Sequence, residues 1–340
     1  MANIHRIGDY SNDNEANRMY PGGQRQMRMG GGLMGNPNPQ SQEDLRNLPF
    51  VNAYSRDQGD PRNENFWSML KIYFWPGFTW KSCIFIIVAI DIIMFIVSLA
   101  ETKELDDDYF LGIETETLWK LGAKDSYKLH NGQVQRWVTP MVLHGGFLHI
   151  LQNVVFQLII GSFFELIVGP LRFLTIYIIS GIGGVLMSAL INDEISVGAS
   201  TALFGITAGL VAFLIVNWVA MESIKEIRCC IMWFVILLVL INVLFGLASQ
   251  DNIDNYGHLG GFVTGLPLAM LLMPVLKTSM RRHEMRGMTY EKYCQIIGGV
   301  SVFLWIGLGI LLFYLKRHPE DTWDRIYRDQ NPDTNIFDIQ

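Results

Sequence analysis

Apolar runs as long as a bilayer-spanning helix recur through most of the chain after residue 80. A helix in a soluble core would interrupt such a run with polar residues at helical spacing, whereas these runs are mostly apolar on every face. A stretch of about 20 apolar residues crosses a membrane. The pattern therefore predicts an all-α polytopic membrane protein. Its seven transmembrane helices are expected near residues 81–100, 148–168, 171–191, 200–220, 230–248, 256–276 and 294–315.

The two ends of the chain follow a different pattern. Residues 1–65 are rich in Asn, Gly, Gln and Pro and have little apolar clustering, which predicts a disordered tail because burial would not offset the entropy of ordering it. Residues 66–80 carry several aromatic side chains, and we expect an amphipathic segment on the membrane surface. The other expected divisions are a six-helix core (81–276), a basic linker (277–293), a seventh transmembrane helix (294–315) and a short tail (316–340).

Charge alternates between the connections of the apolar runs. Arg172 and Arg228 lie in connections of one set, and the other set carries acidic stretches at 101–108, 192–194 and 251–254. Positive residues mark the cytoplasmic side of a membrane protein. We therefore expect the N-terminus in the cytoplasm and the C-terminus in the lumen or outside the cell. Charged residues form 17% of the chain, below the roughly 25% of a soluble domain.

Polar residues with catalytic potential gather at the outer ends of three apolar runs. Ser200 begins the fourth run, His258 begins the sixth, and His149 and Asn153 lie at the start of the second, just after His144. An acyl-transfer nucleophile needs a base within hydrogen-bond reach and donors for the developing oxyanion. Ser200 supplies a hydroxyl and His258 an imidazole, a group that titrates near neutral pH. We therefore predict a serine hydrolase assembled inside the membrane.

Three of these residues are candidates for the oxyanion site. His149 and Asn153 are four residues apart and share one face of a helix. The amide of Ser200 is a further donor, because no intrahelical carbonyl claims the first amides of a helix. Histidine and asparagine also form ordinary hydrogen bonds between membrane helices. Ionisable groups within a membrane nevertheless mark function by default, which favours the catalytic interpretation.

Glycines recur at four-residue spacing in the two runs that carry the serine and the histidine. Gly257, Gly261 and Gly265 lie in the sixth run, and Gly205 and Gly209 lie in the fourth. Small residues at this spacing allow two membrane helices to approach closely. We expect this packing, in which Gly198 just before Ser200 also takes part, to bring the hydroxyl and the imidazole together.

The combined motifs resemble those of the rhomboid intramembrane serine proteases, over roughly residues 80–276. Arg136 resembles the arginine of the family's first-loop Trp-Arg pair, and Glu165, between Gly161 and Gly169, resembles its glycine–glutamate pattern. The motifs that carry the resemblance are His144-x4-His149-x3-Asn153, Gly198-Ala199-Ser200 and Gly257-His258-x2-Gly261-x3-Gly265.

The resemblance implies a rhomboid-like six-helix catalytic core followed by a seventh helix, the eukaryotic six-plus-one arrangement typical of the secretory pathway and plasma membrane. It implies an endopeptidase in which Ser200 attacks a transmembrane helix of a single-pass protein near the outer boundary, with His258 as base and then acid. The Ser200 amide, His149 and Asn153 would hold the oxyanion, and His144 would support them. The expected partners are such substrates and the lipid bilayer, with no nucleic acid, metal or cofactor.

The chain departs from the family pattern at three positions. Thr201 stands where many members have glycine, Gly257 replaces a common alanine, and Gln135 takes the place of the tryptophan beside Arg136, with Trp137 two residues on. None of these changes removes a catalytic group, so activity is still expected.

Two other functions remain open. A metal-dependent hydrolase would use His144, His149 and His258 as ligands, but the first two lie on different helical faces and no His-Glu-x-x-His motif occurs. A non-catalytic rhomboid-like binder in trafficking or degradation would keep its cellular effect after Ser200→Ala. Asp254, four residues before His258, is given no role. A structural or gating role, in preference to a catalytic one, is expected for Asp91 in the first run.

Overall fold

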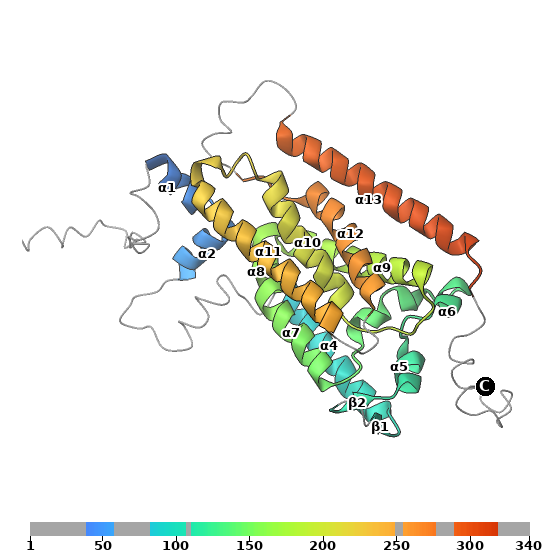
Figure 1. Ribbon diagram of the computed structural model, residues 1–340. Helices are drawn as coiled ribbons and strands as arrows, with labels where there is room; N and C mark the ends of the chain where they lie inside the picture. Colours follow the sequence, from blue (N-terminus) through green and yellow to red (C-terminus); the bar gives the residue numbers. More distant parts are fainter. Residues whose placement is uncertain (1–38, 58–81, 107–109, 249–253, 277–288, 319–340) are drawn as a thin grey trace, which may run out of the picture. The chain divides into compact units, whose positions relative to one another are not determined.

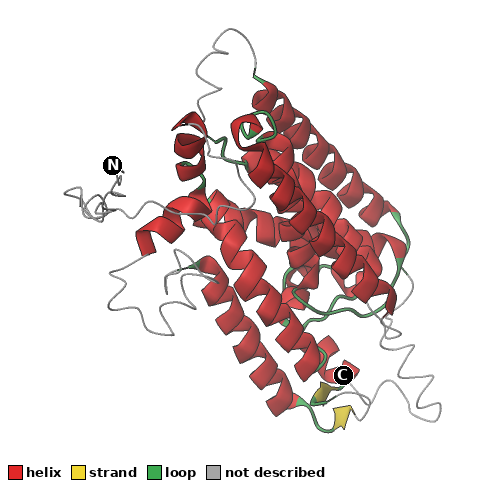
Figure 2. Ribbon diagram, turned by 60° about the vertical axis from the view of Figure 1, so that its left-hand side comes forward, coloured by secondary structure: helices red, strands yellow, loops and turns green. Residues whose placement is uncertain are grey.

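The computed structural model describes residues 39–57, 82–106, 110–248, 254–276 and 289–318, which are mainly helical (Figures 1 and 2). The expected surface segment at 66–80 lies wholly outside these ranges, as do most of the tail at 1–65, most of the linker and most of the final tail.

Each of the seven apolar runs contains a helix. Among the residues that the structure describes, four stretches are long and apolar enough to cross a membrane: Cys83–Glu101, Phe147–Val168, Pro170–Ile191 and Tyr290–Leu315. Ser200–Val216 is a shorter apolar helix. The all-α, membrane-spanning character predicted from the apolar pattern is confirmed. In order, the helices of the runs are α4 (Cys83–Glu101), α7 (Phe147–Phe156), η4 (Gln157–Gly161), α8 (Ser162–Val168), α9 (Pro170–Ile191), α10 (Ser200–Val216), α11 (Lys225–Ala248), α12 (Asn255–Leu272) and α13 (Tyr290–Leu315).

Shorter elements form the connections. The long connection between α4 and α7 begins with an antiparallel pair, in which Leu105 faces Ile113 and Asp106 faces Gly112. These short elements are β1 (Leu105–Asp106), β2 (Gly112–Ile113), α5 (Thr115–Leu121), α6 (Ser126–His130), η2 (Val134–Trp137), η3 (Thr139–Val142) and η5 (Glu222–Ile224).

The structure corrects the expectation of disorder for part of the N-terminal tail. Residues 39–57 form α1 (Pro39–Arg46) and α2 (Pro49–Asp57). Leu48 and Val51 are buried in the main hydrophobic core, and the Asp44 carboxylate accepts a hydrogen bond of 2.6 Å from the Ser223 hydroxyl. These few apolar contacts supply the burial that the segment's composition did not suggest.

Helices α9, α10 and α12 pack together at the centre of the fold, and α13 lies against α12 (Figure 1). Gly261 faces the backbone carbonyl of Thr201 so closely that a Cβ there would overlap the oxygen, and a Cβ at Gly265 would lie 2.5 Å from the Cα of Gly205. The backbones of α10 and α12 therefore touch at Thr201 and Gly205 of one helix and Gly261 and Gly265 of the other. We call this contact the seam.

Two glycines have other roles than the sequence predicted. A Cβ at Gly209 would overlap the ring of Phe164, so this residue admits an aromatic side chain of α8 and does not face α12. Gly198 is not a helix-packing residue, because it precedes α10 in a loop and has φ +129°. This positive φ is accessible to glycine and rarely to other residues.

A carboxylate joins the start of α4 to α8. Glu165 accepts hydrogen bonds from the Ser82 hydroxyl (2.6 Å) and from the amides of Cys83 (2.9 Å) and Ile84 (3.0 Å). These amides belong to the first turn of α4 and have no intrahelical acceptor. Glu165 thus caps one transmembrane helix from another.

A second polar contact lies in the middle of the helices. Gln157, the first residue of the π-helical turn η4, donates through Nε2 to Asp91 Oδ2 (2.7 Å) and to the Tyr177 hydroxyl (2.9 Å). All three side chains are buried. They link α4, η4 and α9, which agrees with the structural role expected for Asp91.

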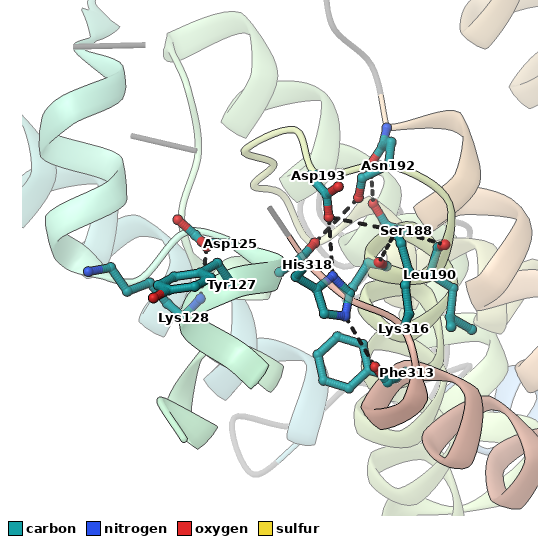
Figure 3. Close-up of polar contacts among 12 residues, drawn as sticks. Asp125, Tyr127, Lys128, Ser188, Leu190, Asn192, Asp193, Phe313, Lys316 and His318 are labelled. Atoms are coloured by element: carbon teal, nitrogen blue, oxygen red, sulfur yellow. Dashed lines mark hydrogen bonds and ion pairs between the residues drawn. The ribbon is translucent and has the colours of Figure 1, made fainter. Parts of the chain in front are cut away.

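Hydrogen bonds from the residues after α13 hold its C-terminal end against the end of α9 (Figure 3). Lys316 Nζ donates to the carbonyls of Ala189 (3.4 Å) and Leu190 (3.1 Å), and His318 Nδ1 lies 3.3 Å from Asp193 Oδ1. Phe313 is fully buried nearby.

Candidate active site

Ser200 and His258 are in direct contact. The Oγ of Ser200 lies 2.7 Å from Nε2 of His258, a normal hydrogen-bond distance. Ser200 is the first residue of α10, and His258 lies in the first turn of α12. The close seam between these two helices brings both side chains to the same end of the bundle.

An aromatic side chain that the sequence analysis missed holds the imidazole in place. The ring of Phe204 stacks on His258 with 4.4 Å between centroids and an interplanar angle of 9°. Phe204 is four residues after Ser200, so it lies on the same face of α10. Within an otherwise apolar run nothing in its spacing distinguished it from a lipid-facing or core phenylalanine.

The loop before Ser200 brings His149 close to the serine. The amide of Gly198 donates to the carbonyl of Pro140 at 2.8 Å. A Cβ at Gly198 would lie 2.8 Å from His149 Nε2 and 3.4 Å from Ser200 Oγ. Glycine at this position therefore allows the imidazole of His149 to lie directly beside the loop that carries the hydroxyl.

The hydrogen bonds of His149 define its tautomer. The amide of Gly145 donates to Nδ1 of His149 at 3.4 Å. Since one nitrogen of a neutral imidazole accepts and the other donates, Nε2 carries the proton. This N–H is on the side of the ring nearest Gly198. Asn153 uses one N–H of its side-chain amide on the carbonyl of His149 (2.8 Å) and has a second one.

His144 lies in the tight entry to α7 and packs against His149. The side chain is fully buried, and the two rings meet edge to face at 5.3 Å. Burial lowers the pKa of His144 to about 3, with the neighbouring His149 acting in the same direction, so the ring is neutral. The backbone of Val142 opposes this shift, although neither ring nitrogen forms a hydrogen bond of good geometry within the described chain.

Asp254, which was left without a role in the sequence analysis, is the N-cap of α12. Its Oδ1 accepts from the amide of Gly257 at 2.8 Å, and its backbone carbonyl accepts from the amide of His258 at 3.0 Å. A carboxylate at this position satisfies a free amide and interacts favourably with the helix dipole. The cap defines the turn on which His258 lies.

Arg136 anchors the long connection from within the protein. The guanidinium is buried, donates to the carbonyl of Ala123 (2.5 Å) and to the Gln133 side chain (2.7 Å), and lies over the ring of Trp119. Trp137 packs against Phe313 of α13, with centroids 5.2 Å apart. The tryptophan beside Arg136 therefore contacts the seventh helix.

The metal-dependent alternative needs a cluster of ligand side chains, which it would draw from His144, His149 and His258. Across the residues that the structure describes, no group of three or more His, Cys, Asp or Glu side chains could hold a metal ion. Nε2 of His258 is already engaged with the hydroxyl of Ser200.

Comparison with known proteins relates residues 131–275 to the family described as Rhomboid domain. The chain is 38% identical to Rhomboid-like protease 3 of Toxoplasma gondii over 195 residues, which cover 57% of the chain and 70% of that protein. It is 36% identical to RHOMBOID-like protein 5 of Arabidopsis thaliana over 174 residues, 50% of the chain and 54% of the relative. It is 37% identical to RHOMBOID-like protein 6, mitochondrial, of the same plant. The chain thus spans about half the length of these plant relatives.

Proposed function

The chain belongs to the rhomboid family, and we propose that it is an intramembrane serine endopeptidase that cleaves transmembrane helices of single-pass proteins. The observation that carries the proposal is the hydrogen bond of 2.7 Å between Ser200 Oγ and His258 Nε2. Relatives that are named proteases support it at the level of the family.

The first step in this proposal is attack by Ser200 on a substrate carbonyl. His258 accepts the hydroxyl proton through Nε2 as the bond forms, and it then donates that proton to the leaving amine. Water attacks the acyl-enzyme in the second half-reaction, with His258 again as base. The bond between the acyl carbon and Ser200 Oγ then breaks, His258 returns the proton to Oγ, and the new carboxylic acid leaves. Stacking on Phe204 keeps the ring plane fixed during these transfers.

Three donors would stabilise the oxyanion. The amide of Ser200 lies at the start of α10, where a helix leaves its amides free. The Nε2–H of His149 and the remaining N–H of Asn153 come from one face of α7. Removing one such donor commonly costs about 100- to 1,000-fold in kcat. His144 supports the ring of His149 from behind.

We further propose that the site opens toward the lumen or the cell exterior. This rests on the acidic connections at the Ser200 end and the basic connections at the opposite end. The seventh helix and the family resemblance favour a membrane of the secretory pathway or the plasma membrane. Substrate helices that unwind readily suit the site, because a peptide bond in a regular helix is shielded.

The test is cleavage by the purified full-length chain in liposomes that contain a panel of model single-pass substrates. Wild type should cleave near the outer boundary, and Ser200→Ala and His258→Ala should reduce the rate at least 1,000-fold, roughly the loss that such groups cause elsewhere. Ser301→Ala, at an exposed position of α13, is the matched control. A fluorophosphonate probe should label wild type and fail on Ser200→Ala.

A non-catalytic binder and a metal-dependent hydrolase give different results. If the protein is a binder, the Ser200→Ala variant keeps the cellular effect. If it is a metal-dependent hydrolase, the Ser200→Ala variant cleaves substrate as wild type does. Either outcome would refute the proposed mechanism.

A further inference from the structure

A lysine in the connection between α4 and α7 is buried completely near the candidate active site. The side chain of Lys124 has no solvent exposure, which is rare for lysine unless its charge is compensated. Its ammonium donates to Ser188 Oγ (2.9 Å), Asn192 Oδ1 (2.8 Å) and the Asn192 carbonyl (3.2 Å). Ser188 and Asn192 lie together at the end of α9 (Figure 3).

The hydroxyl of Ser188 connects this ammonium to the cap of α12. Ser188 accepts from Lys124 Nζ and donates to Asp254 Oδ2. The same carboxylate oxygen accepts from the Ser196 hydroxyl at 2.7 Å. The backbone reinforces the connection, because the amide of Lys124 donates to the carbonyl of Ser196 at 3.0 Å. A cation and an anion thus share one bridging hydroxyl.

The carboxylate end of this chain reaches the first turn of α12. Oδ1 of Asp254 accepts from the amide of Gly257, and His258 is the next residue. Hydrogen bonds therefore run without a break from Lys124 to the turn that carries the imidazole. In the part of the chain that the structure describes, none of these side chains forms a hydrogen bond with the Ser200 hydroxyl, whose partner is His258. Their effect on the hydroxyl would therefore pass through His258.

We propose that Lys124, Ser188 and Asp254 are positioning residues that hold His258 at hydrogen-bond distance from Ser200. The inference rests on the proposed protease function. The positioning role goes beyond that function, because it makes the rate of proton transfer depend on a charged pair outside Ser200 and His258.

The charge of Lys124 provides a pH-dependent readout. Burial lowers the pKa of Lys124 to about 8, against the opposing effect of nearby carboxylates. Its charge is therefore present below pH 8 and is lost as the pH rises above it, which weakens the bridge to Asp254. Groups that face this region are Asp254, Asp193, Glu194, Asp125, Lys316 and His318, with His258 beyond the cap.

The experiment separates the charge from the cap. Asp254→Asn keeps a good N-cap and nearly the same shape but removes the negative charge, and Lys124→Met removes the positive one. The double variant removes both. Lys120→Met is the matched control, because Lys120 is an exposed lysine of α5 that pairs with Glu116. Ser188→Ala removes the bridging hydroxyl and neither charge, and it replaces Lys124→Met if that variant does not fold.

Each variant is measured as the full-length chain in liposomes, with active sites counted by fluorophosphonate labelling. Each single variant should lower kcat per labelled site about 10- to 100-fold, as misplacement of a catalytic group does, with KM within about twofold. The double variant should lose less than the product of the single losses, because removing both charges leaves neither unpaired. Wild-type kcat should fall above pH 8, and the double variant should lack this decline.

Three results would overturn the inference. The first is a kcat per labelled site in the Lys124, Ser188 and Asp254 variants that equals that of Lys120→Met. This result counts against the inference even if the thermal stability or the labelled fraction of those variants falls. The second is a loss of kcat in the double variant equal to the product of the two single losses. The third is a decline of kcat above pH 8 that persists in the double variant. If wild type neither cleaves nor labels, the protease function itself fails and the positioning role fails with it.

Discussion

Ser200 and His258 are 58 residues apart in the chain, yet the hydroxyl of one lies 2.7 Å from the imidazole of the other. The contact depends on the seam of α10 and α12, where the backbone of one helix meets the backbone of the other. Small changes in this seam should therefore change the distance between the two reactive groups.

Gly261→Ala should separate α10 from α12. A methyl group there would overlap the carbonyl oxygen of Thr201, a backbone atom that cannot turn aside. Overpacking of this kind costs about 1–3 kcal/mol, and we expect a lower thermal stability in detergent and the loss of most cleavage activity. Gly307→Ala on α13 is the control, because a Cβ at that glycine meets no atom within 4 Å. Equal stability of the two variants would contradict a tight seam.

Phe204→Ala should slow the reaction without preventing substrate binding. The stacked ring restrains the imidazole of His258, and such aromatic pairs contribute about 0.5–1.5 kcal/mol, which is about 2- to 10-fold in rate. The measurement is kcat and KM in liposomes, with Phe303→Ala on the exposed face of α13 as the control. A change confined to KM would show that Phe204 contacts substrate and does not act on His258.

Asp91→Leu should destabilise the protein more than Asp91→Asn. The asparagine retains an acceptor for Gln157 Nε2, whereas leucine leaves that buried donor with one partner fewer. The expected difference is about 1–2 kcal/mol, typical of a hydrogen bond between membrane helices. Denaturation in mild detergent measures it, and the rate per labelled active site should stay unchanged in both variants. A loss of kcat in Asp91→Asn would assign this carboxylate a part in the reaction.

Chelation should leave cleavage unchanged. The imidazole of His258 is engaged with Ser200, and the proposed steps use only protein groups and water. The assay compares purified protein before and after dialysis against EDTA, with a known metalloprotease treated in parallel. Inactivation that zinc reverses would favour the metal-dependent alternative.

The apolar pattern was sufficient to predict the membrane-helical class, because long runs of one character leave few other structures. The charges of the connections add a direction to each apolar run. Together, the two patterns were sufficient to group Ser200, His258 and His149 at one end of the helices. The geometry between these side chains could not be predicted, because it depends on backbone contacts that spacing alone does not define.

Other features left no periodic signal. Lys124 lies in an irregular connection, and nothing in the adjacent sequence indicates that its ammonium is buried against α9. Gly205 and Gly209 are four residues apart in one apolar run, and only the packed structure distinguishes their surroundings: a Cβ on Gly205 would overlap Ser180 of α9, and a Cβ on Gly209 would overlap the ring of Phe164. The order of residues 39–57 likewise comes from distant partners such as Ser223.

The fastening of α13 to the end of α9 has a consequence for how the protein can be shortened. Lys316 and His318 hold the segment from Ala189 to Asp193, and Ser188 and Asn192 in this stretch also receive the ammonium of Lys124. A version truncated before Tyr290 would therefore lose support for the same few residues that lead to the cap of α12. The last helix thus supports the end of α9 from outside the six-helix core, and a six-helix fragment would lack these contacts.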